Sequence, residues 1–152
     1  MKKLLIILIF MPVFLLAQSY GIGVILGSPT GLTGKMMLGR TSAIAVNAGW
    51  SFWPSSGFHI TGDYQFLFPG SFADEDGRPI NSLIPYLGLG GRVRFKSDDD
   101  DDDDFQAGVR FGGGIEYLPT PMGIFIELYP VVNLIPSTKF AFEGGLGFRI
   151  YF

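Results

Sequence analysis

His59 is the sole histidine of this 152-residue chain, and it lies near Ser55, Ser56 and Asp63 in the sequence. Serine, histidine and an acid are the residue types of a nucleophile, its general base and the group that orients the base. An extended segment through His59 would bring these residues towards one end of a sheet, so a triad is geometrically conceivable. A lone histidine beside turn serines is more often a chance grouping, and we expect no catalytic residues and no enzyme.

Two other patterns could bind ions. Seven consecutive aspartates, residues 98–104, could bind Ca²⁺ or Mg²⁺ weakly, because both cations prefer carboxylate oxygens. The run lacks the glycine and terminal glutamate of an EF-hand, so its simpler interpretation is a solvated, self-repelling connection. Gly34-Lys35 is not a phosphate loop, because Pro29 stands where the first glycine is needed and Met36 replaces the hydroxyl residue. We expect no cofactor.

Composition excludes several classes of protein. The chain has no cysteine, which excludes disulfides, cysteine-based zinc sites and thiol nucleophiles. Its net charge of -3 is opposite to the basic excess of a nucleic-acid-binding domain. Charged residues make up 16% of the chain, against about 25% in soluble domains. The surface is therefore expected to face something other than water.

Residues 1–17 have the pattern of a secretory signal peptide. Lys2 and Lys3 precede the apolar residues 4–16, and Ala17 supplies a small residue for cleavage. The apolar stretch is interrupted by Pro12 and is shorter than the roughly 20 residues of a membrane-spanning helix, so cleavage is favoured over anchoring. The mature chain would then be one domain, residues 18–152.

The rest of the chain consists of eight segments that are rich in β-branched and aromatic residues. They alternate with a period of two and are separated by Gly, Pro, Ser, Thr, Asn and Asp, which is typical of strands and turns. The segments are residues 19–27, 31–38, 43–53, 58–68, 83–96, 105–118, 122–134 and 139–152.

Alternate residues of a strand point to opposite faces of a sheet. In the last segment one face carries Phe140, Phe142 and Leu146, and the other carries Glu143 and Arg149. The other segments that carry charges divide in the same way, with ionisable residues on the face that is rich in glycine and small polar residues. These ionisable residues are Lys35, Asp63, Arg92, Arg94, Arg110, Glu116, Glu127, Glu143 and Arg149.

Two barrel architectures are compatible with eight antiparallel strands. A soluble barrel places apolar side chains inside, whereas a transmembrane barrel places them outside against lipid. A charge facing the bilayer midplane costs about 2–4 kcal/mol, and the apolar face carries none. Open sheet edges are not tolerated in hydrocarbon. The sequence therefore predicts an all-β fold, an eight-stranded antiparallel up-and-down transmembrane β-barrel.

The signal peptide, the eight segments and the terminal Gly147-Phe148-Arg149-Ile150-Tyr151-Phe152 resemble the small outer-membrane barrels of the OmpA/OmpX type. The resemblance implies a bacterial outer-membrane location, with lipid and lipopolysaccharide around the wall. It also implies that the barrel-assembly machinery reads Phe148, Ile150 and Phe152. The chain departs from OmpA because no periplasmic peptidoglycan-binding domain follows the barrel, and because the link at 69–82 is long for a periplasmic turn.

With both termini periplasmic, the aromatic residues on the lipid face fall into two groups at opposite ends, as interfacial girdles do. Phe52, Phe58, Phe95, Phe105 and Phe140 are expected near the outer end, and Tyr20, Phe66, Phe68, Tyr117 and Phe152 near the inner end. The aspartate run then lies in the third external loop, where divalent cations could bridge it to lipopolysaccharide phosphates.

Three functions remain open. An eight-stranded barrel has an interior just wide enough to be filled by side chains, so a charged plug with a structural or surface-interaction role is favoured. The second candidate function is a narrow or gated pore for small solutes or ions. A lipid A-modifying enzyme is the third, but such barrels use a lipid-facing His-x-Ser pair. His59 and Thr61 are expected inside, and threonine replaces the serine.

Overall fold

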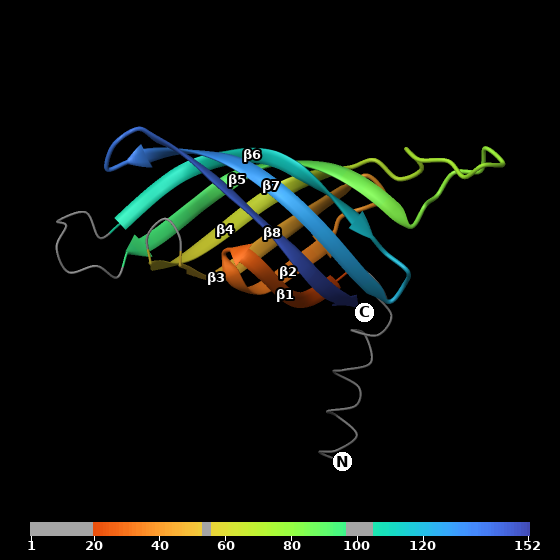
Figure 1. Cartoon of the computed structure of the whole chain (residues 1–152), viewed down its shortest axis with the longest axis horizontal. Coiled ribbons are helices and arrows are strands. Elements are labelled where there is room, and N and C mark those ends of the chain that lie inside the picture. The colour runs from red at the N-terminus through yellow and green to blue at the C-terminus, as the bar shows by residue number, and fades with distance from the viewer. Residues whose placement is uncertain (1–19, 53–55, 97–104) are drawn as a thin grey trace, which may run out of the picture.

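The computed structural model describes residues 20–52, 56–96 and 105–152, and in these ranges the regular structure is a single closed β-barrel (Figure 1). Each strand pairs antiparallel with its sequence neighbour, and β1 pairs with β8 to close the sheet. Among the described residues, no helix is long and apolar enough to cross a membrane. The strands are β1 (Tyr20–Ser28), β2 (Thr30–Met37), β3 (Ser42–Ser51), β4 (Gly57–Leu67), β5 (Leu83–Lys96), β6 (Phe105–Tyr117), β7 (Met122–Ile135) and β8 (Lys139–Tyr151).

All eight predicted segments form strands. Turn residues set their ends: Pro119 and Pro121 separate β6 from β7, and Pro136 separates β7 from β8, because proline cannot donate to a ladder. The β6–β7 ladder shifts register between Ala107 and Gly108, which is a bulge that the alternating pattern did not predict. The predicted signal peptide at 1–17 lies outside the described residues.

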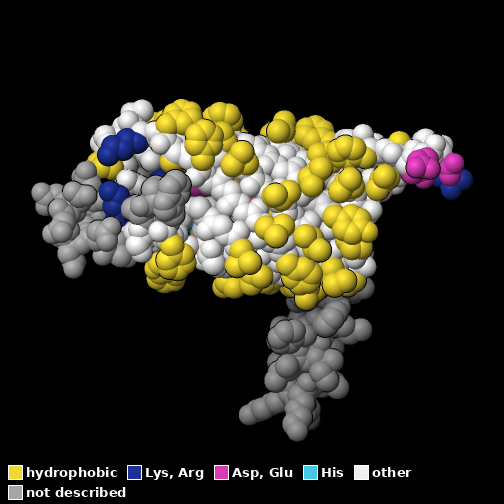
Figure 2. Space-filling view, viewed as in Figure 1, with side chains coloured by type: hydrophobic (Ala, Val, Ile, Leu, Met, Phe, Trp, Pro, Cys, Tyr) yellow, Lys and Arg dark blue, Asp and Glu magenta, His cyan; other side chains and the backbone are white. Residues whose placement is uncertain are grey.

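The outer wall of the barrel is apolar. Outward side chains such as Leu32, Leu128 and Phe142 are more than half exposed. Hydrophobic side chains cover the wall on the face shown in Figure 2, and the coloured acidic and basic side chains gather towards the ends. A soluble protein of this size would not expose so large an apolar surface.

Aromatic residues on this wall gather near both ends, as the strand order requires. At the end that carries the β5–β6 and β7–β8 connections, which we call the loop end, Trp50 packs on Phe58 with ring centroids 4.8 Å apart and Phe95 packs on Phe105 at 5.5 Å. The opposite end, which we call the terminal end, has the C-terminus, and exposed aromatic side chains lie there too. They are Tyr20, Phe66, Phe68, Tyr117 and Phe152.

The interior is not uniformly polar. At the terminal end lies an apolar cluster, with Ala43, Leu67, Ile84 and Tyr86 buried and Met37 and Leu118 packed against them. Ile25 and Val131 are also buried, at 1% and 0% exposure. The lumen therefore holds bulky apolar side chains beside its charges and glycines, because a narrow barrel needs such side chains to fill it.

The long connection between β4 and β5, residues 68–82, projects beyond the terminal end of the barrel (Figure 1). It contains its own turn: Asp74 Oδ1 accepts hydrogen bonds from the backbone N–H of Asp76 at 3.0 Å and of Arg78 at 2.8 Å. Gly77 has a φ of 77° in this turn, a conformation that glycine adopts without steric cost. The link therefore forms a short hairpin-like turn rather than an open loop.

Candidate functional site

All nine charged residues assigned to the lumen from the sequence lie inside the barrel. Their relative exposures range from 0 to 6%. Five are cationic and four are anionic, and the contacts that the structure gives join them into three groups along the barrel axis. The residues are Lys35, Asp63, Arg92, Arg94, Arg110, Glu116, Glu127, Glu143 and Arg149.

The group nearest the terminal end is centred on Glu116 of β6. Lys35 of β2 donates to Glu116 Oε2 at 2.6 Å, and Tyr151 of β8 donates to Oε1 at 2.5 Å. Arg149 lies 3.4 Å from the same Oε1 and donates to Thr33 Oγ1 at 2.7 Å. Because β2 and β6 are on opposite sides of the ring of strands, these contacts cross the lumen.

The middle group is centred on Arg110 of β6. Its Nε lies 2.9 Å from Asp63 Oδ1, its Nη1 2.7 Å from Glu143 Oε2 and its Nη2 3.7 Å from Glu127 Oε1. The guanidinium also lies 3.9 Å from the centroid of the Tyr129 ring. One planar, five-donor group therefore connects β4, β7 and β8, a geometry that arginine provides and lysine does not.

The group nearest the loop end is centred on Arg92 of β5. Arg92 donates to Glu143 Oε1 and, at 2.7 Å, to Asn133 Oδ1. Glu143 is thus shared between Arg92 and Arg110, which joins the loop-end and middle groups. His59 Nδ1 lies 3.5 Å from Glu143 Oε1, and Arg94 is buried beyond Arg92 towards the mouth, at 4% exposure.

The sequence predicts the positions of the neutral partners of these charges, but not the hydrogen bonds that they make. Alternation places Thr33, Gln106, Asn133 and Tyr151 on the inner face, but it does not show that they bond to Arg149, Arg92 or Glu116. The β3–β4 side of the lumen holds buried polar atoms that have no hydrogen-bond partner among the described residues. They include Asn47 Oδ1, Gln65 Oε1 and both ring nitrogens of His59. Such atoms normally bond to ordered water.

The residues considered for catalysis and metal binding are only partly described by the structure. His59 and Thr61 are fully buried in the lumen, so neither faces lipid. Ser55 and the aspartates 98–104 lie outside the described residues. Within the ranges that the structure describes, no three His, Cys, Asp or Glu side chains are grouped to hold a metal ion.

Eight antiparallel strands closed into a cylinder, with an apolar wall and a charged interior, define a small transmembrane β-barrel. The predicted fold class is confirmed. Among solved structures, the N-terminal β-barrel domain of OprF from Pseudomonas aeruginosa is similar, with a TM-score of 0.65, and the match covers 90% of this chain and 99% of that one. The sequences are 16% identical, so the likeness shows a shared fold. No protein-family model and no curated protein matches the sequence.

Proposed function

We propose that the protein is a bacterial outer-membrane barrel with a structural or surface-interaction role, and that its own side chains close its lumen. The observation that carries the proposal is the continuous chain of contacts from Arg92 through Glu143 to Arg110, Asp63 and Glu127. The apolar cluster at the terminal end lies in line with it. Together they would block the path that a pore would take.

The proposal includes the route to the membrane. Residues 1–17 would direct export, and the barrel-assembly machinery would read the outward residues Phe148, Ile150 and Phe152 of β8. Ile150 and Phe152 are about half exposed on the barrel wall, where a recognition strand must be accessible. Outer-membrane lipid and lipopolysaccharide would surround the wall, and the aspartates 98–104 would bind divalent cations weakly.

Planar-bilayer recording tests the closed lumen. The folded chain, verified by its strand signal in circular dichroism, should give no discrete conductance steps, and a strain without it should show a weakened envelope. Stepwise conductance of the native chain would overturn the plug and favour the second candidate, a narrow pore. The buried polar atoms of Asn47, Gln65 and His59 favour that candidate because they can bond to a file of water. In a pore, Arg110→Gln and Glu127→Gln should each change the conductance.

Modification of lipid A is the third candidate, and the burial of His59 argues against it. His59 is 0% exposed and its neighbouring carboxylate, Glu143, is bonded to two arginines. Mass spectrometry of lipid A from cells that carry the native chain, the His59→Ala variant or neither should give identical spectra. A species that depends on His59 would contradict a non-enzymatic role.

A further inference from the structure

The two strands that close the barrel, β1 and β8, differ in how far they reach towards the loop end. They pair with each other as far as Ser28 and Gly144, because β1 ends where the chain turns at Pro29. β8 continues through residues 139–143, which pair with β7 on one side. Neither β1 nor β2 pairs with the other side of this segment. The wall therefore has a notch between β8 and the β1–β2 turn.

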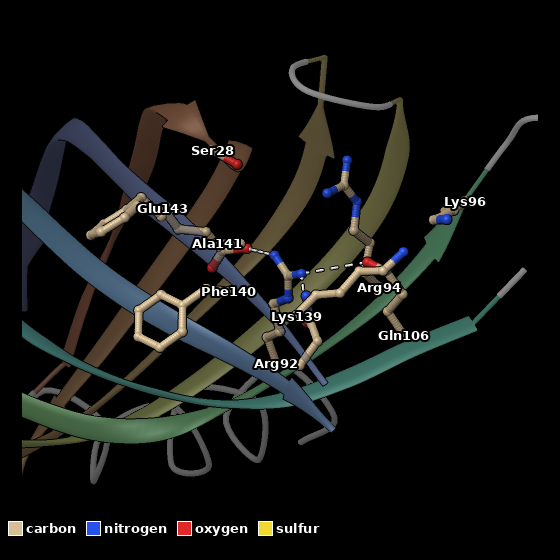
Figure 3. A pocket seen from close by; sticks show the side chains of 11 residues that line it. Ser28, Arg92, Arg94, Lys96, Gln106, Lys139, Phe140, Ala141 and Glu143 are labelled. Carbon is tan, nitrogen blue, oxygen red and sulfur yellow. Dashed lines mark hydrogen bonds and ion pairs between the residues drawn. The ribbon is translucent and has the colours of Figure 1, made fainter. Parts of the chain in front are cut away.

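A cavity of about 250 Å³ at the loop end reaches this notch. Its described lining includes Gln106 and Asn133 from the lumen, and Ser28, Ala141 and Phe142 from the two sides of the notch. Figure 3 shows Ser28 at the end of β1 and Ala141 on β8. The Phe142 side chain is 66% exposed on the outer wall. The cavity therefore connects the polar lumen with the apolar outer surface through the side of the barrel.

An apolar groove of about 210 Å³ follows the same seam deeper in the wall. Across the seam, Leu26 pairs with Leu146 and Val24 pairs with Phe148. The wall of a transmembrane barrel contacts lipid, and the groove is continuous with that wall, so an acyl chain is the occupant that its surroundings supply. Every described residue of the lining is apolar or glycine. These residues are Val24, Leu26, Ile124, Leu146, Gly147 and Phe148.

The cavity and the groove meet where the seam carries only small side chains. Between them lie the paired residues Ser28 and Gly144, so no bulky group separates the two spaces. The outward Phe140 and Phe142 lie beside the notch, and aromatic residues of this kind mark the membrane interface. From Ser28 to Val24 the strand spans about 13 Å, close to the roughly 15 Å of half a hydrocarbon core. A lipid bound here would therefore have its polar end at the interface and its chain in the membrane.

We propose that this seam binds a monoacylglycerol, with the single acyl chain in the groove and the glycerol head in the cavity. The hydroxyl of Ser28 and the amides of Gln106 and Asn133 both donate and accept hydrogen bonds, as the hydroxyl and ester groups of glycerol require. Backbone groups along residues 139–143 can bond to the same head, since unpaired backbone is costly at membrane depth. The match uses hydrogen bonds and does not depend on how the charged side chains of the lining are paired.

Native mass spectrometry of the folded chain, released from non-ionic detergent micelles with added monomyristoylglycerol, tests the proposal. The native chain should retain one molecule of the lipid. Val24→Trp fills the groove and should weaken binding about tenfold, the scale of about two buried methylene groups. Val46→Trp is the matched control, because Val46 is also an outward valine, at 46% exposure against 50% for Val24, and lies on β3 away from the seam. It should leave the affinity unchanged.

The polar end of the site is tested separately. Ala141→Phe places a ring in the cavity beside the notch and should also weaken binding about tenfold, so it remains informative if Val24→Trp fails to fold. Tetradecane, which has the chain without the head, should bind at least tenfold more weakly than monomyristoylglycerol. Absence of the lipid from the native chain, equal affinities of Val24→Trp and Val46→Trp, or equal binding of tetradecane and monomyristoylglycerol would overturn the proposal.

Discussion

Arg110 connects three of the buried carboxylates in the lumen. Its guanidinium reaches three carboxylates on three strands and lies over the Tyr129 ring at 3.9 Å. Removal of one member of such a group leaves the others charged and desolvated, which is more damaging than absence of the whole group. The stability of the interior therefore depends on complete pairing.

Substitution Arg110→Met should destabilise the barrel by about 3–5 kcal/mol, because Asp63, Glu127 and Glu143 would lose their shared cation inside the lumen. Urea unfolding in phospholipid vesicles, followed by tryptophan fluorescence, measures the change in the free energy of unfolding. Arg40→Met, at an exposed turn position, should change it by less than about 0.5 kcal/mol. Equal stability of the two variants would show that the network contributes little.

Gly147 provides the space for an aromatic ring that supports Arg149. A Cβ at position 147 would lie 2.1 Å from Phe125 Cζ, and the Arg149 guanidinium lies 3.7 Å from the Phe125 ring centroid. Gly147→Ala should therefore cost about 1–3 kcal/mol through overpacking. The same substitution in a Phe125→Leu chain should cost less, because the clashing ring is gone. A double-mutant cycle in unfolding free energies measures this coupling, and additive effects would contradict the proposed contact.

At the scale of the strands, alternation predicted the fold because lipid and lumen impose opposite demands on successive residues. The predicted ends of β5 match the structure, and those of β7 and β8 differ by one residue. β1 was harder to interpret, since Ile25 is apolar and yet points inward. The pairing of Lys35 with Glu116 could not be predicted, because it joins residues 81 positions apart. It depends on the tilt and stagger of strands in the closed barrel, which no local pattern encodes.

The seam between β1 and β8 requires a glycine at position 23. A Cβ there would lie 1.7 Å from the Phe148 carbonyl oxygen, so Gly23→Ala must push apart the two strands that close the barrel. We expect a loss of about 1–3 kcal/mol in unfolding free energy. Gly62→Ala is the matched control, because nothing lies within 4 Å of a Cβ at that position. Urea unfolding of both variants in vesicles checks the difference, and indistinguishable midpoints would show that the seam can relax.

The whole molecule is divided into three layers along its axis. An apolar cluster lies at the terminal end, paired charges lie further along the lumen, and a cavity lined in part by arginine and lysine side chains opens at the loop end. Outside, the wall is apolar between two groups of aromatic residues. This order explains the low fraction of charged residues in the chain. The wall contacts the bilayer instead of water and needs no charged side chains, so the described charged residues lie only in the interior and at the two ends.

The apolar wall should respond to charge according to depth in the membrane. Leu128 lies halfway along β7 and Leu134 lies near its loop end, and their exposures are similar, at 59% and 55%. In a water-soluble barrel, lysine at either position would be nearly neutral. In a bilayer, Leu128→Lys should cost about 2–4 kcal/mol and Leu134→Lys about 0–1 kcal/mol. Reversible unfolding in phospholipid vesicles measures both values against the native chain. Equal, small costs at the two positions, together with native protein that stays monodisperse without detergent, would show that this wall faces water.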